Sequence, residues 1–304
     1  MSISNSNFNS FRFVLTGFPG LEVHYPWLCI PFSSIYALVF LGNCMVLHVI
    51  RTESSLHQPM FSFLAMLALT DLCMGFSTVP TVLGILLGFI QEISLDSCIA
   101  QSYFIHGQSF MESSVLLAMA FDRYLTICNP LRYSSILTND KIIKIGVAIL
   151  CRSSLLTPPV IILLKFLNYC HPYILSHSFC LHQDLIRIAC SDICFNSNYA
   201  LTLVISNLLL DEVLILISYI MILHTVLAFA SWEERFKSLQ NCVSHIWAVL
   251  VFYIPIIGLT MVHRFGKCLS PLVHVLMGNI YVIFPPMMNP IIYSIKTQKI
   301  RRRA

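Results

Sequence analysis

Residues 27–50 read WLCIPFSSIYALVFLGNCMVLHVI and contain no Asp, Glu, Lys or Arg. A helix crosses the hydrocarbon core of a bilayer with roughly 20 apolar residues, so this stretch is long enough to span a membrane. Six more stretches of similar character follow along the chain. Together they predict an all-α membrane protein whose seven transmembrane helices lie at Trp27–Ile50, Met60–Gly88, Ile99–Cys128, Ile142–Leu164, Tyr199–Ala228, Ile246–Val262 and Leu272–Ile295.

The composition also indicates a membrane protein. Charged residues make up 11% of the 304 residues, against roughly 25% in soluble proteins, and the mean hydropathy is +0.79. The net charge of +4 does not indicate nucleic-acid binding, because the basic residues lie at the ends of segments and not in one patch. We expect one domain over residues 1–304, with an extracellular N-terminus (1–26), a helix bundle with its loops (27–295) and a short cytoplasmic tail (296–304).

The distribution of Lys and Arg predicts the orientation of the bundle. Short cytoplasmic loops are enriched in these residues. Eleven of them share a side with the C-terminus and five lie on the opposite side. This places the C-terminus in the cytoplasm and, with seven spans, the N-terminus outside. Because residues 1–9 are polar and uncharged, unlike a signal peptide, we expect the first helix to direct insertion.

Polar residues inside the predicted spans narrow the function, since such residues are costly in lipid and mark functional sites. The chain has no His-Glu-x-x-His, Gly-x-Ser-x-Gly or Walker A motif, which argues against an enzyme. It has no repeated halves, which argues against a transporter. The last span lacks a lysine for a retinal Schiff base. The polar residues are Asn43, Asp71, Glu112, Asp122, Arg123, Arg152, Asp211, Glu212, His245 and Asn289.

Several motifs, in a fixed order along the whole chain, resemble those of rhodopsin-like G-protein-coupled receptors and, more narrowly, olfactory receptors. Three further stretches are similar to the class I, or fish-like, branch of that family: Gly17–Glu22, His182–Asp184 and His263–Gly266. The motifs that carry the general resemblance are Gly42-Asn43, Leu56–Phe61, Asp71, Met119–Leu131 (which contains Asp122-Arg123-Tyr124), Ser218-Tyr219, Lys237 with Cys242–His245, and Asn289–Tyr293.

The resemblance implies an activation switch at the inner ends of the helices. In the family, the residue matching Arg123 is held in the inactive receptor and released toward a G protein in the active one. Two readings of His245 stay open: its protonation biases the switch, or it is a satisfied core histidine. For Arg152 we expect a snorkelling side chain. The predicted switch residues are Asp122, Arg123, Tyr124, Tyr219, His245, Asn289, Pro290 and Tyr293.

Two buried carboxylates, Asp71 and Glu112, are expected near one another. Two bare anions in a medium of low dielectric constant repel, so one is protonated or a cation lies between them. The resemblance implies a sodium or water site, with polar help from Asn43 and Asn289; a structural hydrogen-bond pair is the alternative. No other cofactor or metal is expected. Of the adjacent Asp211 and Glu212, which point about 100° apart, the resemblance favours the first facing inward.

The ligand site is expected between the helices near the outer surface. In class I receptors the residue matching Arg264 resembles a carboxylate anchor, although this arginine can also be a plain charge at the edge of a loop. The residues of the sixth helix are predicted to form one stripe. The predicted ligand-contacting residues are Ile105, His106, Ser109, Phe110, His182, Gln183, Tyr253, Ile256, Ile257, Thr260 and Arg264.

The predicted function is an odorant receptor in the plasma membrane of olfactory neurons. Its ligand is a small volatile organic molecule, with an aliphatic carboxylic acid favoured, and its partner is a stimulatory olfactory G protein that raises cyclic AMP. The alternatives are a receptor for a non-odorant metabolite outside olfactory tissue, or a small-molecule transporter.

The outer cysteines have partners that the resemblance implies: Cys98 with Cys180, and Cys170 with Cys190. The alternative is a zinc site that joins Cys180 and Cys190 to His177 and His182, but an oxidising exterior removes the thiolates that it needs. Cys194 and Cys268 depart from the family pattern and are either free or paired with each other.

Three other departures from the family pattern concern delivery of the protein to the cell surface and its coupling to a G protein. Asn5, Asn7 and Asn9 all fail the Asn-x-Ser/Thr pattern, so no N-glycosylation site is predicted and we expect poor delivery to the cell surface. Thr126 and Asn129 stand where the family often has Ala and His, and we expect weaker G-protein coupling from them.

Overall fold

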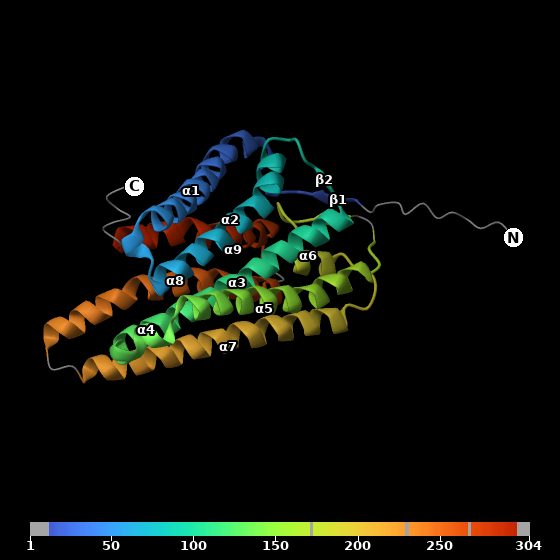
Figure 1. Ribbon diagram of the computed structural model, residues 1–304. Coiled ribbons are helices and arrows are strands. Elements are labelled where there is room, and N and C mark those ends of the chain that lie inside the picture. The colour runs from blue at the N-terminus through green and yellow to red at the C-terminus, as the bar shows by residue number, and fades with distance from the viewer. Residues whose placement is uncertain (1–11, 171–172, 229–230, 267–268, 297–304) are drawn as a thin grey trace.

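The computed structural model describes residues 12–170, 173–228, 231–266 and 269–296. These residues are mostly helical, and seven long helices lie alongside one another in a bundle (Figure 1). The strands and the short helix α6 gather at one end, which we call the sheet end, and α4 lies at the opposite end. The predicted bundle of seven long helices is confirmed, and the chain is a multi-pass membrane protein by the length and composition of these helices.

Several of the long helices run beyond the spans predicted from hydropathy. The largest difference is in α8, which begins at Trp232 and not near Ile246. Its added turns contain Glu, Arg, Lys and Gln, which favour helix in water, so hydropathy marks the membrane boundary and not the end of the helix. The long helices are α1 (Tyr25–Thr52), α2 (Pro59–Leu86), α3 (Leu95–Cys128), α5 (Asn139–Lys165), α7 (Cys194–Leu227), α8 (Trp232–Phe265) and α9 (Pro271–Lys296).

The helix α3 is the polar centre of the bundle. Six of the seven long helices are apolar and long enough to cross a membrane over the described residues, and α3 is the exception. It packs against α2, α5, α7 and α8, and four of its serines, Gln101 and Glu112 are buried. By contrast, α7 leaves apolar side chains such as Leu209, Leu210 and Val213 exposed on its outer face. Lipid is the natural cover for a face of this kind.

A small sheet closes the sheet end and was not predicted. The strand β1 (Arg12–Leu15) pairs antiparallel with β2 (Glu92–Ser94) and parallel with β3 (Ile174–Leu175). The first strand alternates between exposed and buried residues: Phe13 and Leu15 lie inside. They join an apolar cluster with residues of α2, α3, α5 and α6, so the predicted extracellular tail in part forms a cover over the bundle.

Short helices complete the connections. The helix α6 (His182–Arg187) lies in the loop between α5 and α7, and α4 (Tyr133–Ile136) in the loop between α3 and α5. Single 3-10 turns occupy Glu22–His24, Ser54–Leu56 and Pro130–Arg132. The helix α6 places His182, Asp184 and Leu185 against the bundle, where all three are buried.

Candidate functional site

Two disulfide bonds brace the sheet end. Cys98, in the first turn of α3, is bonded to Cys180, and Cys170 is bonded to Cys190, with Cα atoms 5.3 and 5.8 Å apart. Both pairs agree with the predictions. The alternative zinc site needed thiolates from Cys180 and Cys190, and oxidised sulfurs cannot supply them, so that alternative is wrong.

Two of the polar residues predicted to contact a ligand meet where α3 lies against α6. The rings of His106 (α3) and His182 (α6) meet edge to face with centroids 6.1 Å apart. Nε2 of each ring and Oε1 of Gln183 are buried and have no hydrogen-bond partner among the described residues. Burial, with a smaller effect of the His106 ring, lowers the pKa of His182 to about 3. Buried polar atoms without partners are rare, so these three mark a place for water or a guest molecule.

The neighbouring residues of α3 form the apolar wall of this region. Ile105 and Phe110 are buried, as a lining role requires. The hydroxyl of Ser109 donates to the Ile105 carbonyl at 3.1 Å and contacts the Tyr281 hydroxyl of α9. Sequence reasoning missed Tyr281, although a tyrosine in an apolar helix signals a need for a hydroxyl partner.

The predicted stripe on α8 is only partly correct. Tyr253 and Ile256 are buried, and Thr260 is half-buried with its hydroxyl donating to the Ile256 carbonyl at 2.8 Å. Ile257, which is 46% exposed, points away from the bundle, and Arg264 is exposed in the last turn of the helix. The prediction for Ile257 failed because i+4 from Tyr253 lies on the edge of a stripe that i+3 and i+7 define. Arg264 has the right rotation but lies where the neighbouring helices no longer cover it.

Three apolar grooves of about 460, 480 and 560 Å³ lie between neighbouring helices. They run between α7 and α8, between α3, α5 and α7, and between α5 and α7, and exposed leucines and isoleucines line them. None of these three grooves is lined by a predicted ligand-contacting residue. Their composition suits lipid chains, so we do not assign the ligand site to them.

A buried ion pair ties four helices together. Arg152 (α5) donates to both carboxylate oxygens of Asp211 (α7) at 2.8 and 2.9 Å and to the Ser114 hydroxyl at 2.8 Å. Ser113 donates to the same carboxylate at 2.7 Å and bonds the Tyr253 hydroxyl at 3.0 Å. Asp211 faces inward, as predicted. The snorkelling position predicted for Arg152 is wrong, because the carboxylate offers a far stronger partner than the headgroups.

The two predicted carboxylates meet at one amide. The side-chain nitrogen of Asn289 (α9) donates to Asp71 (α2) at 3.1 and 3.2 Å and to Glu112 (α3) at 3.1 Å. Both carboxylates are buried, and Asn289 Oδ1 is buried without a described partner. Asn43 does not belong to this cluster: its amide donates to the Pro286 carbonyl at 3.0 Å and so ties α1 to α9.

The predicted switch residues Asp122 and Arg123 are not paired with each other. The buried Asp122 carboxylate accepts a hydrogen bond from Tyr133 of α4 at 2.8 Å. The Arg123 guanidinium contacts the sulfur of Met60 (α2), and its Nε is buried without a partner in the described part of the chain. At the end of the bundle opposite the sheet, Arg123 is therefore held only by a weak contact with a sulfur atom among the described residues.

The pair Tyr219–His245 links α7 to α8. His245 Nε2 lies 3.0 Å from the Leu116 carbonyl, which can only accept, so this nitrogen carries the proton. Nδ1 is then the acceptor for the Tyr219 hydroxyl at 2.7 Å. This arrangement favours the satisfied core histidine over the protonation reading. Tyr293 is buried with its hydroxyl 3.9 Å from the Met119 sulfur.

The other residues singled out near the opposite end have local contacts. The Asn129 amide lies 3.5 Å from the Tyr124 hydroxyl, and the Thr126 hydroxyl donates to a carbonyl one turn earlier at 2.8 Å. Pro290 packs against Gly42, where an added Cβ would lie 3.0 Å from the proline ring. The close approach of α1 and α9 therefore depends on a glycine at this position.

A second histidine cluster lies in the loop above the bundle. His177 Nδ1 contacts the Asp184 carboxylate, and both side chains are fully buried. Burial alone raises the pKa of the Asp184 carboxyl, but the adjacent His177, with smaller effects of His263 and Arg187, offsets this and holds it below its usual value. Sequence reasoning considered only His177, and with the wrong partners.

Some predictions concern residues outside the described ranges. They include the absent glycosylation site at Asn5–Asn9, the tail from residue 297 and any pairing of Cys268. Cys194 is an exposed free thiol in the first turn of α7.

Comparison with known proteins gives one consistent result. A family profile described as olfactory receptor matches residues 32–304. The chain is 74% identical to olfactory receptor 51V1 of Homo sapiens over 99% of its own length and 94% of the relative's. It is 54% identical to olfactory receptor 51L1 of Homo sapiens over 95% of the chain and 92% of that protein, and 50% identical to olfactory receptor 51B5 over 98% and 95%.

Proposed function

This chain belongs to the olfactory receptor family, and from that premise we propose that it binds a small volatile organic ligand at the sheet end and signals through a stimulatory G protein at the opposite end. The proposal includes the orientation with the N-terminus outside, location in the plasma membrane and a rise in cyclic AMP. The family is not one of enzymes.

One observation carries the location of the ligand. His106 belongs to α3, whereas His182 and Gln183 belong to α6, and each of the three keeps a buried polar atom without a described partner. Ile105 and Phe110 provide apolar surface beside them. A small site with apolar walls and a few convergent polar groups is the usual form of a small-molecule pocket. We assign the polar end of the ligand to these atoms.

For the chemical class we propose an aliphatic carboxylic acid anchored by Arg264. This side chain has no ion-pair partner among the described residues, and binding requires it to turn inward from its exposed position in the last turn of α8. Thr260 lies one turn below. That exposure favours the alternative, a neutral alcohol or aldehyde held by His106, His182 and Gln183. The two classes differ in whether they need a cation.

The expected free energy of binding suits a receptor that binds its ligand weakly. Six buried methylene groups contribute about 5 kcal/mol and a charge-assisted hydrogen bond about 1.5–3 kcal/mol. Loss of translational and rotational freedom costs at least about 4 kcal/mol. The balance of about 2.5–4 kcal/mol corresponds to dissociation constants of roughly a millimolar or weaker.

The test is a screen of straight-chain acids, alcohols and aldehydes in cells that express the receptor with a stimulatory olfactory G protein. We expect concentration-dependent cyclic AMP from one of these series, lost in His182→Ala at matched surface level. A labelled compound that accumulates in the cells without cyclic AMP would identify a transporter instead. A response that His182→Ala leaves unchanged would remove the proposed ligand site.

We further propose that Asp71 and Glu112 hold a sodium ion or water. Both groups and the unpartnered Asn289 Oδ1 supply oxygen ligands, which suit a hard cation. If sodium binds, NaCl should raise the melting temperature of the purified receptor more than equimolar choline chloride does. The variant Glu112→Gln should lose that difference. Equal effects of the two salts on the wild type would contradict a sodium site.

A further inference from the structure

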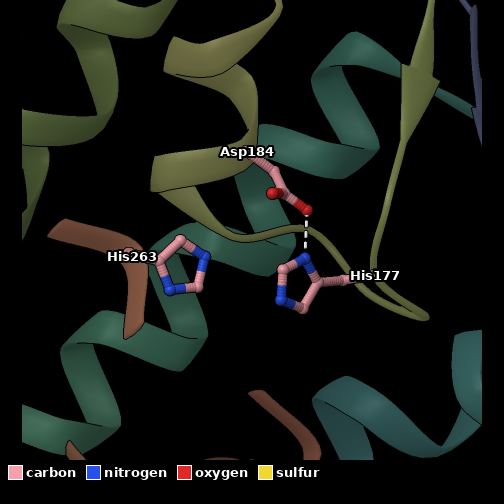
Figure 2. A group of neighbouring side chains, drawn as sticks. All are labelled: His177, Asp184 and His263. Atoms are coloured by element: carbon pink, nitrogen blue, oxygen red, sulfur yellow. Dashed lines mark hydrogen bonds and ion pairs between the residues drawn. The ribbon is translucent and has the colours of Figure 1, made fainter. Parts of the chain in front are cut away.

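His177, Asp184 and His263 converge at the sheet end, outside the region assigned to the odorant. His177 and Asp184 belong to the loop that contains α6, and His263 belongs to the last turn of α8 (Figure 2). One ligand atom from each of the three side chains lies within 4.8 Å of the others. The rings of His177 and His263 are stacked with centroids 5.4 Å apart. His177 and Asp184 are fully buried and His263 is half-buried.

The hydrogen bonds of the two rings fix which nitrogens carry protons. His177 Nε2 lies 3.1 Å from the carbonyl of His274, and His263 Nδ1 lies 3.0 Å from the carbonyl of Leu259. A carbonyl oxygen can only accept, so both of these nitrogens are donors. In the neutral rings, His177 Nδ1 and His263 Nε2 are left with free lone pairs.

Both lone pairs point toward an anion. His177 Nδ1 faces a carboxylate oxygen of Asp184, and the His263 ring lies beside them in Figure 2. His263 Nε2 is buried and has no partner among the described residues. Lone pairs and a carboxylate cannot bond one another directly, so a positive species must lie between them. A single proton on His177 satisfies one nitrogen and leaves His263 Nε2 without a partner.

We propose that His177 Nδ1, His263 Nε2 and the Asp184 carboxylate bind a divalent transition-metal ion, with zinc as the reference case. Two imidazoles and one carboxylate are a known zinc ligand set that leaves a fourth position for water. Metal-bound histidines almost always donate their other ring N–H to a carbonyl or carboxylate. Both rings here already do so.

The geometry needs a limited adjustment. Zinc bonds of about 2.0–2.1 Å place tetrahedral ligands roughly 3.3 Å apart, so atoms now up to 4.8 Å apart must approach by about 1.5 Å at most. His177 Nδ1 and the Asp184 oxygen are in direct contact, so the carboxylate must move away from that ring to admit the ion. The His263 ring, on a half-buried side chain at a helix end, can make that movement. The His177 ring is fixed against α9 by Gly278, where an added Cβ would lie 2.7 Å from the ring.

An ion at this position would join the loop that covers the bundle to the end of α8. The loop is already bonded to α3 through Cys98–Cys180, and the metal would add a second connection, this time to a different helix. It lies beside the odorant region and shares no residue with it. The proposal does not depend on the ligand or on G-protein coupling.

Metal binding is best measured directly, on full-length receptor in lipid nanodiscs that has been stripped with a chelator. The probe is ZnCl₂, titrated against a fluorescent zinc indicator without odorant or G protein. All forms carry Cys194→Ser, because a free exposed thiol also binds zinc. Reducing agents are left out so that Cys180 stays oxidised.

The variants are a matched pair of histidine substitutions. His263→Phe keeps a ring of similar size and removes one ligand. His274→Phe makes the same change in a neighbouring imidazole, whose ring lies 5.4 Å from His263 and whose backbone carbonyl is retained. We expect one tight site in the parent, at least about 100-fold weaker binding in His263→Phe and Asp184→Asn, and unchanged binding in His274→Phe. Gly278→Ala should weaken binding by about tenfold, as loss of a supporting contact does.

A second readout guards against misfolded variants. Zinc should raise the melting temperature of the parent by mass action, and it should not do so for His263→Phe. Absence of a tight site in the parent would overturn the proposal. Equal weakening in His263→Phe and His274→Phe would also overturn it, because the ion would then be bound by a different set of residues.

Discussion

Arg264 and His263 are adjacent in the last turn of α8, but only His263 is turned toward the loop of the sheet end. The two positions lie 100° apart on the helix: Arg264 continues the stripe of Tyr253 but is exposed at the helix end, whereas His263 is half-buried. Sequence reasoning chose the arginine for its charge. The two side chains now support separate proposals, one for an acid ligand and one for a metal ion.

The role of Arg264 in ligand choice gives a residue-scale prediction. A carboxylate that enters an apolar site loses its hydration, and a fixed cation is needed to offset that loss. Arg264→Ala should therefore weaken acids by about 2 kcal/mol, roughly thirtyfold in potency, and leave matching alcohols nearly unchanged. Arg264→Lys should restore only part of the potency, because an ammonium lacks the two-pronged geometry. The measurement is a dose–response series on all three forms, and equal losses for acid and alcohol would end the acid hypothesis.

Arg123 gives a second prediction at this scale. Among the described residues its guanidinium contacts a methionine sulfur, and the neighbouring Asp122 carboxylate keeps its hydrogen bond from Tyr133 when Arg123 is removed. We expect Arg123→Ala to reach the membrane folded and to lose agonist-dependent cyclic AMP. Arg51→Ala, which removes an exposed arginine from the last turn of α1, is the control and should signal normally. Undiminished signalling by Arg123→Ala at matched surface level would contradict its assignment to the switch.

At the scale of elements, the strongest connection between helices is the pair Arg152–Asp211. Asp211 is buried, and the partly exposed Arg152 borders an apolar groove, so water does not compensate a lost partner. Breaking a buried pair on one side costs about 3–5 kcal/mol, and replacing both partners by apolar groups costs less. Asp211→Leu should thus lower thermal stability more than Arg152→Leu with Asp211→Leu does. Melting curves in nanodiscs test this order, and a double variant less stable than Asp211→Leu would contradict the pairing.

The elements also show how far the sequence could predict the fold. Long stretches with few charges located all seven long helices, although only six of the described helices are apolar enough to span a membrane by composition alone and α3 is more polar. Hydropathy could not locate the polar start of α8 or the sheet, since β1 has only the alternation of Arg12–Leu15 to signal it and its partners lie far along the chain.

The candidate sites were likewise predictable from the sequence only in part. Motifs placed Asp71, Glu112 and Asn289 together, and the family pattern paired the cysteines correctly. Contacts between helices that depend on rotation, such as Arg152 with Asp211 or His177 with His263, have no local signal in a single sequence. Asn43 was expected to join the two carboxylates on the strength of its motif. Its amide instead donates to a backbone carbonyl of α9.

For the whole molecule, delivery to the surface is the open question that the sequence raises. No Asn-x-Ser/Thr site occurs in the chain, so we expect little surface staining in generic cells. Asn9→Ser completes such a site beginning at Asn7, and it should increase surface staining and add a glycosidase-sensitive mass. Asn9→Ala, which removes the same side chain without creating a site, should behave like the wild type. High surface levels of the unglycosylated wild type would contradict the expected dependence.

The sheet joins strands that lie far apart in the first 175 residues, and this sets an order of events during synthesis. Val14 pairs with Ile174, so the first strand leaves the ribosome 160 residues before its parallel neighbour. At about 5–20 residues per second, it waits roughly 10–30 s with one backbone edge unpaired. By the end of that interval α1, α2, α3 and α5 have been synthesised, whereas α7, α8 and α9 have not. The three strands can therefore pair before the last three helices are synthesised, and until then the first strand is the segment on which a chaperone would act.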